Sequence, residues 1–197
     1  METFQQEEQA ETETQPPTEE KINWGRFALD LVETLVLAVV LFVGINTVSA
    51  RVRVDGTSMV PTLQDGEFVL VNKLSYRFGD VTRGDIIVFH FPLNPQEDLI
   101  KRVIGLPGDQ VKIENGQVFV NGALLNETYI AAPPNYASDW QVPADNFFVL
   151  GDNRNNSSDS HSWGLLPSDK IVGKAVLIYW PPPLWKVIQH PDILAVQ

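Results

Sequence analysis

The sequence contains no cysteine, and this absence excludes several kinds of site. The chain cannot form a disulfide, use a thiolate as nucleophile, or hold zinc or an iron–sulfur cluster through cysteine. Positive charge is also scarce: 14 Lys and Arg residues stand against 25 Asp and Glu, which gives a net charge of -11 at pH 7. Because a nucleic-acid partner requires a basic surface, this balance argues against one.

Much of the acidity lies in the first 24 residues. Several glutamates precede Lys21 there, mixed with glutamine, threonine and proline. Segments with high net charge and few apolar side chains cannot bury enough surface to fold. We therefore predict a disordered acidic tail over residues 1–24, followed by a chain long enough for one folded domain.

The sequence has one long apolar run, between Phe27 and Val48. Its uninterrupted part, Leu35–Ile45, would span only about 16 Å as a helix, whereas a bilayer core is about 30 Å thick. The flanks must therefore contribute, and Asp30 and Glu33 then lie near one interface. We predict a single transmembrane helix over residues 27–48, with a buried core helix as the alternative.

The orientation of this helix is not determined by its flanking charges. Lys21 and Arg26 before it are matched by Arg51 and Arg53 after it, so the positive-inside rule gives no answer. A cleaved signal peptide is a weaker interpretation, because the run begins late and follows an acidic segment.

Residues 51–180 carry the pattern of a mainly β, antiparallel domain. Short β-branched and aromatic runs are bounded by turn residues, and Asn115–Gly116 separates two alternating runs as in a hairpin. Residues 131–143 are rich in proline and predict a long irregular loop. Residues 181–197 predict a tail that packs loosely on the domain.

Ser58 lies in a short polar turn, Val54–Leu63, directly after the apolar run. Gly56 permits unusual backbone angles, and Pro61 restricts the chain on the other side, so the turn can hold a hydroxyl in a defined place. We interpret Ser58 as a candidate nucleophile. Taken alone, the segment is more typical of a surface turn.

Lys101 lies within the apolar strand Leu99–Ile104. If the strand alternates, one of the two adjacent cations, Lys101 or Arg102, points inward. Burial lowers the pKa of a lysine, and a neutral amine can take the proton of a serine hydroxyl. The alternative is a lysine that is paired with an acid or reaches solvent.

The third candidate segment is the polar loop Gly151–Gly164. It does not have the spacing of a calcium-binding EF-hand loop, because Ser157 and Trp163 stand where glycine and glutamate are needed. His161 leaves a Ser-His-Asp triad open as an alternative, since His90 lies within a strand and His190 near the end of the chain.

Together these segments resemble type I signal peptidase, in a match that runs from the apolar helix to about Tyr179. The resemblance rests on four segments in the expected order: Ser58–Leu63, Arg83–Phe89, Lys101–Asp109 and Gly151–His161. It implies a membrane-anchored serine endopeptidase that removes signal peptides from exported preproteins. It also implies a position in the cell (inner) membrane, or the thylakoid membrane, with the catalytic domain on the extracytoplasmic face.

The resemblance further implies a role for individual residues. Ser58 corresponds to the nucleophile and Lys101 to the general base, with Ser157 hydrogen-bonded near the lysine amine. The positions that support the site are Asp152, Arg154 and Asp159.

Two positions depart from the family pattern. Gly56 stands where some members have a serine that helps to hold the oxyanion, so Gly56 is a weaker candidate for that role. His161 stands where some members have an arginine, so its pairing with Asp159 becomes dependent on pH.

The implied partners are preproteins and the lipid bilayer, with no metal or cofactor. The substrate would bind by adding a strand to an exposed sheet edge. Another membrane-bound Ser-Lys peptidase, such as the organellar inner-membrane type or a relative of the self-cleaving repressors, is an alternative. The absence of a DNA-binding segment weighs against a repressor. A non-catalytic membrane-anchored β module is an alternative of a different class.

Overall fold

The computed structural model describes residues 23–191 and residue 193. Almost all of the predicted acidic tail therefore lies outside the described residues. Helix α1 spans Trp24–Val48, and none of its residues is buried. At 1.5 Å per residue its length is about 37 Å, so it is long and apolar enough to cross a membrane.

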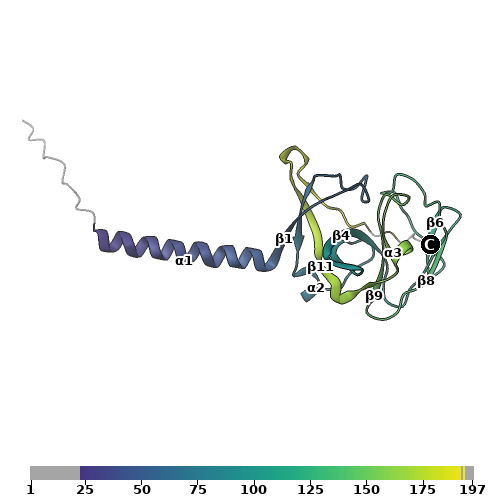
Figure 1. Ribbon diagram of the computed structural model, residues 1–197, viewed down its shortest axis with the longest axis horizontal. Helices are drawn as coiled ribbons and strands as arrows, with labels where there is room; N and C mark the ends of the chain where they lie inside the picture. The colour runs from purple at the N-terminus through teal and green to yellow at the C-terminus, as the bar shows by residue number, and fades with distance from the viewer. Residues whose placement is uncertain (1–22, 192, 194–197) are drawn as a thin grey trace, which may run out of the picture. The chain divides into compact units, whose positions relative to one another are not determined.

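The rest of the described chain is built from two antiparallel sheets (Figure 1). The larger sheet has the strand order β1-β2-β11-β3-β4-β9-β10, with β12 paired to β11. Its strands are β1 (Ser49–Arg53), β2 (Phe68–Asn72), β3 (Ile86–Phe91), β4 (Asn94–Gly105), β9 (Asn146–Leu150), β10 (Leu166–Pro167), β11 (Ile171–Trp180) and β12 (Lys186–Val187).

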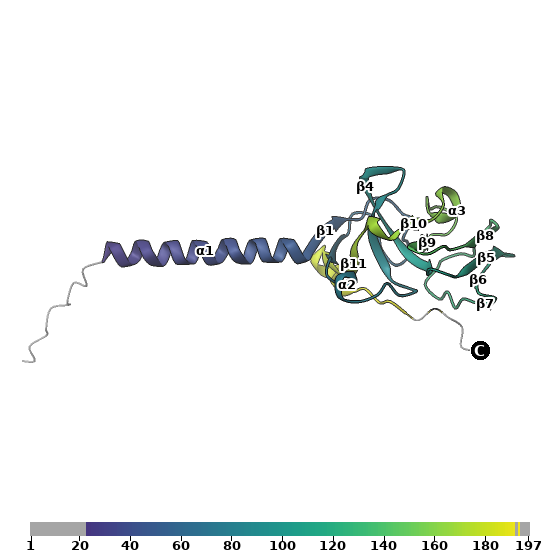
Figure 2. The ribbon, with the colours of Figure 1, turned by 90° about the horizontal axis from the view of Figure 1, so that it is seen from below.

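The smaller sheet has the order β7-β6-β5-β8 and lies on the side of the larger sheet away from β1 (Figure 2). Its strands are β5 (Gln110–Glu114), β6 (Gln117–Val120), β7 (Ala123–Leu124) and β8 (Ser138–Gln141). The short helices are α2 (Ser75–Phe78), α3 (Ser160–Trp163), and the 3-10 turns Ser168–Lys170 and Pro182–Leu184.

The mainly β, antiparallel fold predicted from the sequence is confirmed. The Asn115–Gly116 turn joins β5 to β6, with Glu114 opposite Gln117 in the register. Both turn residues have positive φ, 52° and 76°, as this tight hairpin turn requires.

Two segments are more ordered than their sequences predict. Within residues 131–143, expected to be an irregular loop, Ser138–Gln141 forms β8 and pairs with β5. The C-terminal tail, expected to pack loosely, is anchored at two residues, because Ile188 and Ile193 are buried in the two main apolar clusters, while most of residues 181–191 are exposed. Both segments are held by partners distant in sequence, which a local pattern does not reveal.

The larger sheet leaves a groove between β1 and the first half of β4. Within the described part of the chain, strand β1 pairs only with β2, and β4 pairs with β9 only from Arg102 onward. The groove has a volume of about 460 Å³, and both Ser58 and Lys101 line it. The fold therefore brings the two candidate residues to one concave surface, between two strand edges.

Candidate active site

Ser58 is presented by the turn between β1 and β2. Met59 and Leu63 are buried on either side of Pro61 and anchor the turn in the core. Gly56 has a φ of +93°, and its N–H donates to Oδ1 of Asp65 at 2.8 Å. The buried side chains and the hydrogen bond to Asp65 therefore hold the turn in place. Ser58 itself is half-buried and lines the groove.

Lys101 reaches Ser58 from β4, across the groove. Its Nζ donates to Oγ of Ser58 at 2.9 Å and to the carbonyl oxygen of Ile100 at 3.1 Å. Lys101 is only 3% exposed. The structure therefore brings together two candidates that are 43 positions apart in the sequence.

The environment of Lys101 favours its neutral form. Burial lowers the pKa of the amine from 10.5 to about 8, and the negative charges of Asp159, Asp152 and Glu97 oppose this shift. With that pKa, roughly one lysine in ten is neutral at pH 7. The neutral amine has a lone pair, so the hydrogen bond to Ser58 can reverse and the hydroxyl can donate its proton.

The polar loop after β9 packs against the Ser58 turn. The N–H of Asn153 donates to the carbonyl oxygen of Ser58 at 3.0 Å. A Cβ atom on Gly151 would lie 2.5 Å from this same carbonyl oxygen and 2.3 Å from Oγ of Ser157. Only glycine fits there, because a side chain would push the loop away from the nucleophile.

Asp159 orients this loop from within. It is fully buried, accepts from the N–H of Gly151 at 2.8 Å, and caps α3 together with Ser162. Oδ1 of Asp159 lies 2.6 Å from Nδ1 of His161, whose ring stacks on Tyr136 with centroids 3.9 Å apart. The predicted pairing of His161 with Asp159 is therefore present in the structure.

Asp152 forms a buried ion pair with Arg102. Nε of Arg102 donates to Oδ1 at 2.8 Å and a terminal nitrogen donates to Oδ2 at 2.7 Å, and the Thr62 hydroxyl donates to the same carboxylate. The expectation that one of the two adjacent cations points inward understated the burial: Lys101 and Arg102 are both buried. Strand β4 has protein on both faces, so its alternation sends each cation into a different part of the core.

Arg154 forms a second buried ion pair, with Glu127. Its guanidinium donates to both carboxylate oxygens, at 2.8 and 2.5 Å, and to the carbonyl oxygen of Gly151 at 3.1 Å. Tyr129 lies between the two ion pairs, 4.0 Å beneath the guanidinium of Arg102 and within 3.3 Å of Arg154. Glu127, Tyr129, Thr62 and Arg102 were not identified from the sequence as site residues.

Two expectations for the site need correction or restriction. The predicted hydrogen bond from Ser157 to the lysine is not formed: its Oγ is buried and has no partner among the described residues. His161 interacts with Asp159, and within residues 23–191 and 193 no hydrogen bond joins it to Ser58. The geometry thus favours Lys101 over His161 as the partner of Ser58. The described part of the chain also shows no group of three or more acidic or histidine side chains able to hold a metal.

The buried pair Arg102–Asp152 gives a direct stability test. Arg102→Met is expected to lower the free energy of unfolding by about 3–5 kcal/mol, because it leaves the Asp152 carboxylate buried without its countercharge. Urea unfolding of the detergent-solubilised protein, followed by tryptophan fluorescence, measures the change. Arg102→Met combined with Asp152→Leu should recover most of the loss, whereas Lys112→Met, at an exposed ion pair, should change little. Equal effects at the buried and exposed pairs would contradict this account.

Comparison with known proteins identifies the family of this chain. The family described as signal peptidase, peptidase S26, matches residues 28–180. A probable signal peptidase I-2 from Synechocystis sp. is 48% identical over 166 residues, which cover 79% of this chain and 74% of the relative. Signal peptidase I from Bacillus caldolyticus is 43% identical over 143 residues, covering 65% and 78% of the two chains. A crystal structure of a signal peptidase I from Enterococcus faecalis is 33% identical and covers 48% of this chain and 96% of its own, with a TM-score of 0.43. The chain belongs to the signal peptidase S26 family.

Proposed function

We propose that this signal peptidase cleaves preproteins by a Ser-Lys dyad in which Ser58 is the nucleophile and Lys101 the general base. The 2.9 Å contact between Lys101 Nζ and Ser58 Oγ carries the proposal. Neutral Lys101 takes the Ser58 proton while Oγ attacks the scissile carbonyl carbon, and the resulting ammonium protonates the departing amine. The amine, neutral again, then takes a proton from the water that hydrolyses the acyl-enzyme.

The oxyanion of the tetrahedral intermediate must be stabilised by at least one N–H group that points toward it. The backbone N–H of Ser58 suits this role, since it makes no hydrogen bond to any residue in the described part of the chain. The N–H of Gly56 is already bound to Asp65, so Gly56 contributes through the shape of the turn. The roles of Asp152, Arg154 and Asp159 are to hold the loop and the strand on which the dyad depends.

The groove between β1 and β4 suits an extended peptide. Among the described residues, β1 has one edge that pairs with no other strand, and β4 is unpaired on its β9 side before Arg102, so a substrate can add its own backbone hydrogen bonds there. Side chains alternate along an extended chain, so positions one and three residues before the scissile bond face the same wall.

This arrangement predicts a requirement for small side chains at those two positions. Replacing either with leucine or phenylalanine is expected to reduce cleavage at least roughly tenfold, because a shallow pocket has no room for the additional methylene groups of the larger side chain. The same substitution two residues before the scissile bond serves as the control and should be tolerated. Incubation of the detergent-solubilised protein with a model preprotein, followed by sequencing of the mature N-terminus, tests both. Equal cleavage of all variants would refute the pocket arrangement.

Only a short length of chain separates the membrane helix from the nucleophile. Ser58 is ten positions beyond Val48, the last residue of α1. A signal peptide presents its cleavage site at the end of its own apolar segment, close to the membrane surface. From the resemblance to signal peptidases we infer that the β domain lies on the extracytoplasmic face, where preproteins emerge, in the cell membrane or the thylakoid membrane.

A further inference from the structure

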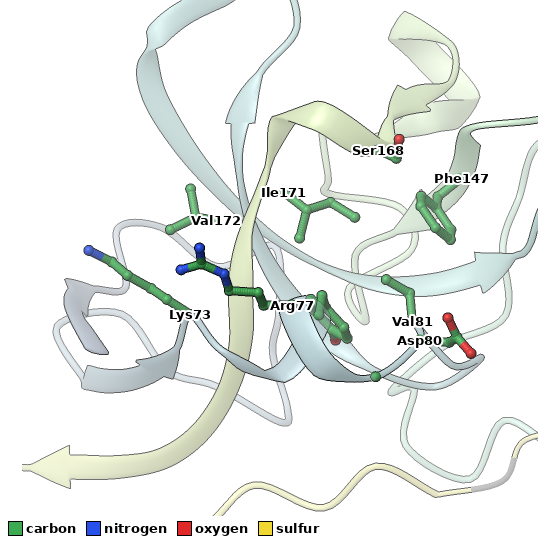
Figure 3. Close-up of a pocket in the computed structure, with 10 residues that line it drawn as sticks. Lys73, Arg77, Asp80, Val81, Phe147, Ser168, Ile171 and Val172 are labelled. Carbon is green, nitrogen blue, oxygen red and sulfur yellow. The ribbon is translucent and has the colours of Figure 1, made fainter. Parts of the chain in front are cut away.

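A second concave site lies outside the catalytic groove, at helix α2 (Figure 3). It has a volume of about 430 Å³ and shares no lining residue with the groove that holds Ser58 and Lys101. Lys73 and Arg77 contribute its basic side chains, and Phe147 and Val172 belong to its apolar lining. The dyad mechanism does not use this pocket.

The two cations of the pocket have no acidic partner. Lys73 and Arg77 are exposed, and no carboxylate oxygen in the described part of the chain lies within 4.0 Å of either one. In Figure 3 the amine and the guanidinium reach the same side of the pocket, near Val172, while Asp80 lies at the opposite end. In a protein of net charge -11, two cations on one side of a pocket with no carboxylate partner among the described residues form a local site for an anion.

Backbone contacts fix the pocket beside the end of the apolar helix. The N–H of Lys73 donates to the carbonyl oxygen of Val48 at 3.0 Å, and Nζ of Lys73 donates to the carbonyl oxygen of Asn46 at 3.4 Å. Asn72 pairs with Ser49 in the β1–β2 register. Because α1 anchors the protein in the membrane, its end lies at the interface, so Lys73 lies at the level of the lipid phosphates.

An apolar hollow includes Leu74 of the same segment in its lining. It has a volume of about 370 Å³, and its lining includes Val48, Leu70, Leu74 and Val176. Phe78, which directly follows Arg77, is 83% exposed, so its apolar ring is available to bury in the membrane interface. The segment from Lys73 to Phe78 thus combines free positive charge with apolar surface.

We propose that this segment binds an anionic phospholipid, with the phosphate between Lys73 and Arg77 and an acyl chain along Leu70, Leu74 and Val176. The carboxylate of Asp80 disfavours a second negative charge in the pocket, so a headgroup with a single phosphodiester fits best. Phosphatidylglycerol has this chemistry. Since β1 is joined directly to α1 and borders the catalytic groove, a lipid bound beside it would hold the groove at the membrane surface.

The inference rests on the membrane anchoring of the proposed function but not on the Ser58–Lys101 chemistry. A binding measurement therefore tests it separately. Full-length protein in detergent micelles is mixed with dioleoylphosphatidylglycerol or dioleoylphosphatidylcholine, and native mass spectrometry counts the lipids retained. Wild type should retain phosphatidylglycerol about tenfold better, because each cation near a headgroup favours the anionic lipid.

Matched variants assign this preference to the pocket. Lys73→Gln combined with Arg77→Gln should abolish it, whereas Lys112→Gln combined with Lys186→Gln removes two exposed cations elsewhere and should preserve it. Ser58→Ala should retain the lipid as wild type does, so loss of catalysis and loss of the lipid site are distinguishable. Equal retention of the two lipids by wild type, equal loss in both double variants, or displacement of the lipid by an equal concentration of glycerophosphate would overturn the proposal.

A kinetic readout tests the consequence for the reaction. In nanodiscs that contain phosphatidylglycerol, wild type should show a lower KM for a membrane-inserted preprotein than in phosphatidylcholine nanodiscs. The Lys73 and Arg77 double variant should lose this difference while kcat on a short soluble peptide stays unchanged. An unchanged lipid dependence in that variant would contradict a role for the pocket in presenting the groove.

Discussion

Replacing Ser58 with alanine is expected to reduce preprotein cleavage by roughly 10⁴-fold or more while the fold is retained. The change removes one hydroxyl whose side-chain hydrogen bond is to Lys101. The turn itself is anchored by Met59 and Leu63, which the substitution leaves in place. Any residual rate would come from the groove and the oxyanion donor, which can still bind and polarise the substrate.

Cleavage of a radiolabelled preprotein by the full-length variant, followed by gel electrophoresis, measures this loss. Ser158→Ala provides the matched control, because Ser158 lies in the neighbouring loop, is exposed, and forms no side-chain hydrogen bond within the described residues. It should cleave as wild type does. A Ser58→Ala variant with normal activity would exclude the serine mechanism and would favour a different nucleophile.

The parts of the fold that the sequence predicted are those with a local signal. Alternating runs around Asn115–Gly116 define a hairpin by themselves, and the apolar run before Val48 defines a helix. Strand β8 has no such signal, since its polar residues become a strand only through pairing with β5. The burial of Ile193 likewise depends on a contact with Asn126, far away in the sequence.

The sequence likewise predicted only part of the candidate site. Ser58 and Lys101 stand in recognisable segments, and the structure places them in contact. The partners that hold the site, Arg102 for Asp152 and Glu127 for Arg154, are 50 and 27 positions away from the residues they pair with. A buried ion pair leaves no periodic pattern, so the sequence indicates the charged residues in the loop but not their partners.

Lys101→Arg is expected to eliminate turnover, by roughly 10³-fold or more, while substrate binding persists. Arginine keeps the positive charge but does not lose its proton at any pH that the protein tolerates. If Lys101 served only as a partner for Asp159 and Asp152, arginine would replace it with a modest loss. Single-turnover cleavage and binding of a signal-peptide fragment distinguish these cases.

The pH dependence of the wild type provides the complementary evidence. The pKa of Lys101 is lowered to about 8, and the neutral amine is the active form, so kcat/KM should rise with pH up to about 8 and then level off. Below that point the rate should fall about tenfold per pH unit, because the neutral fraction falls by that factor. A profile with its acid limb near pH 6.5, the ordinary range of histidine, would not fit a lysine base.

His161→Gln separates the dyad from a triad in the same assay. His161 contacts Asp159, whose charge raises the pKa of Lys101 against the effect of burial. Glutamine removes the imidazole that contacts Asp159 but leaves the contact between Lys101 and Ser58 in place, so the acid limb should persist. If His161→Gln were inactive and Lys101→Arg active, the base would be the histidine, and the Ser-His-Asp arrangement would replace the dyad.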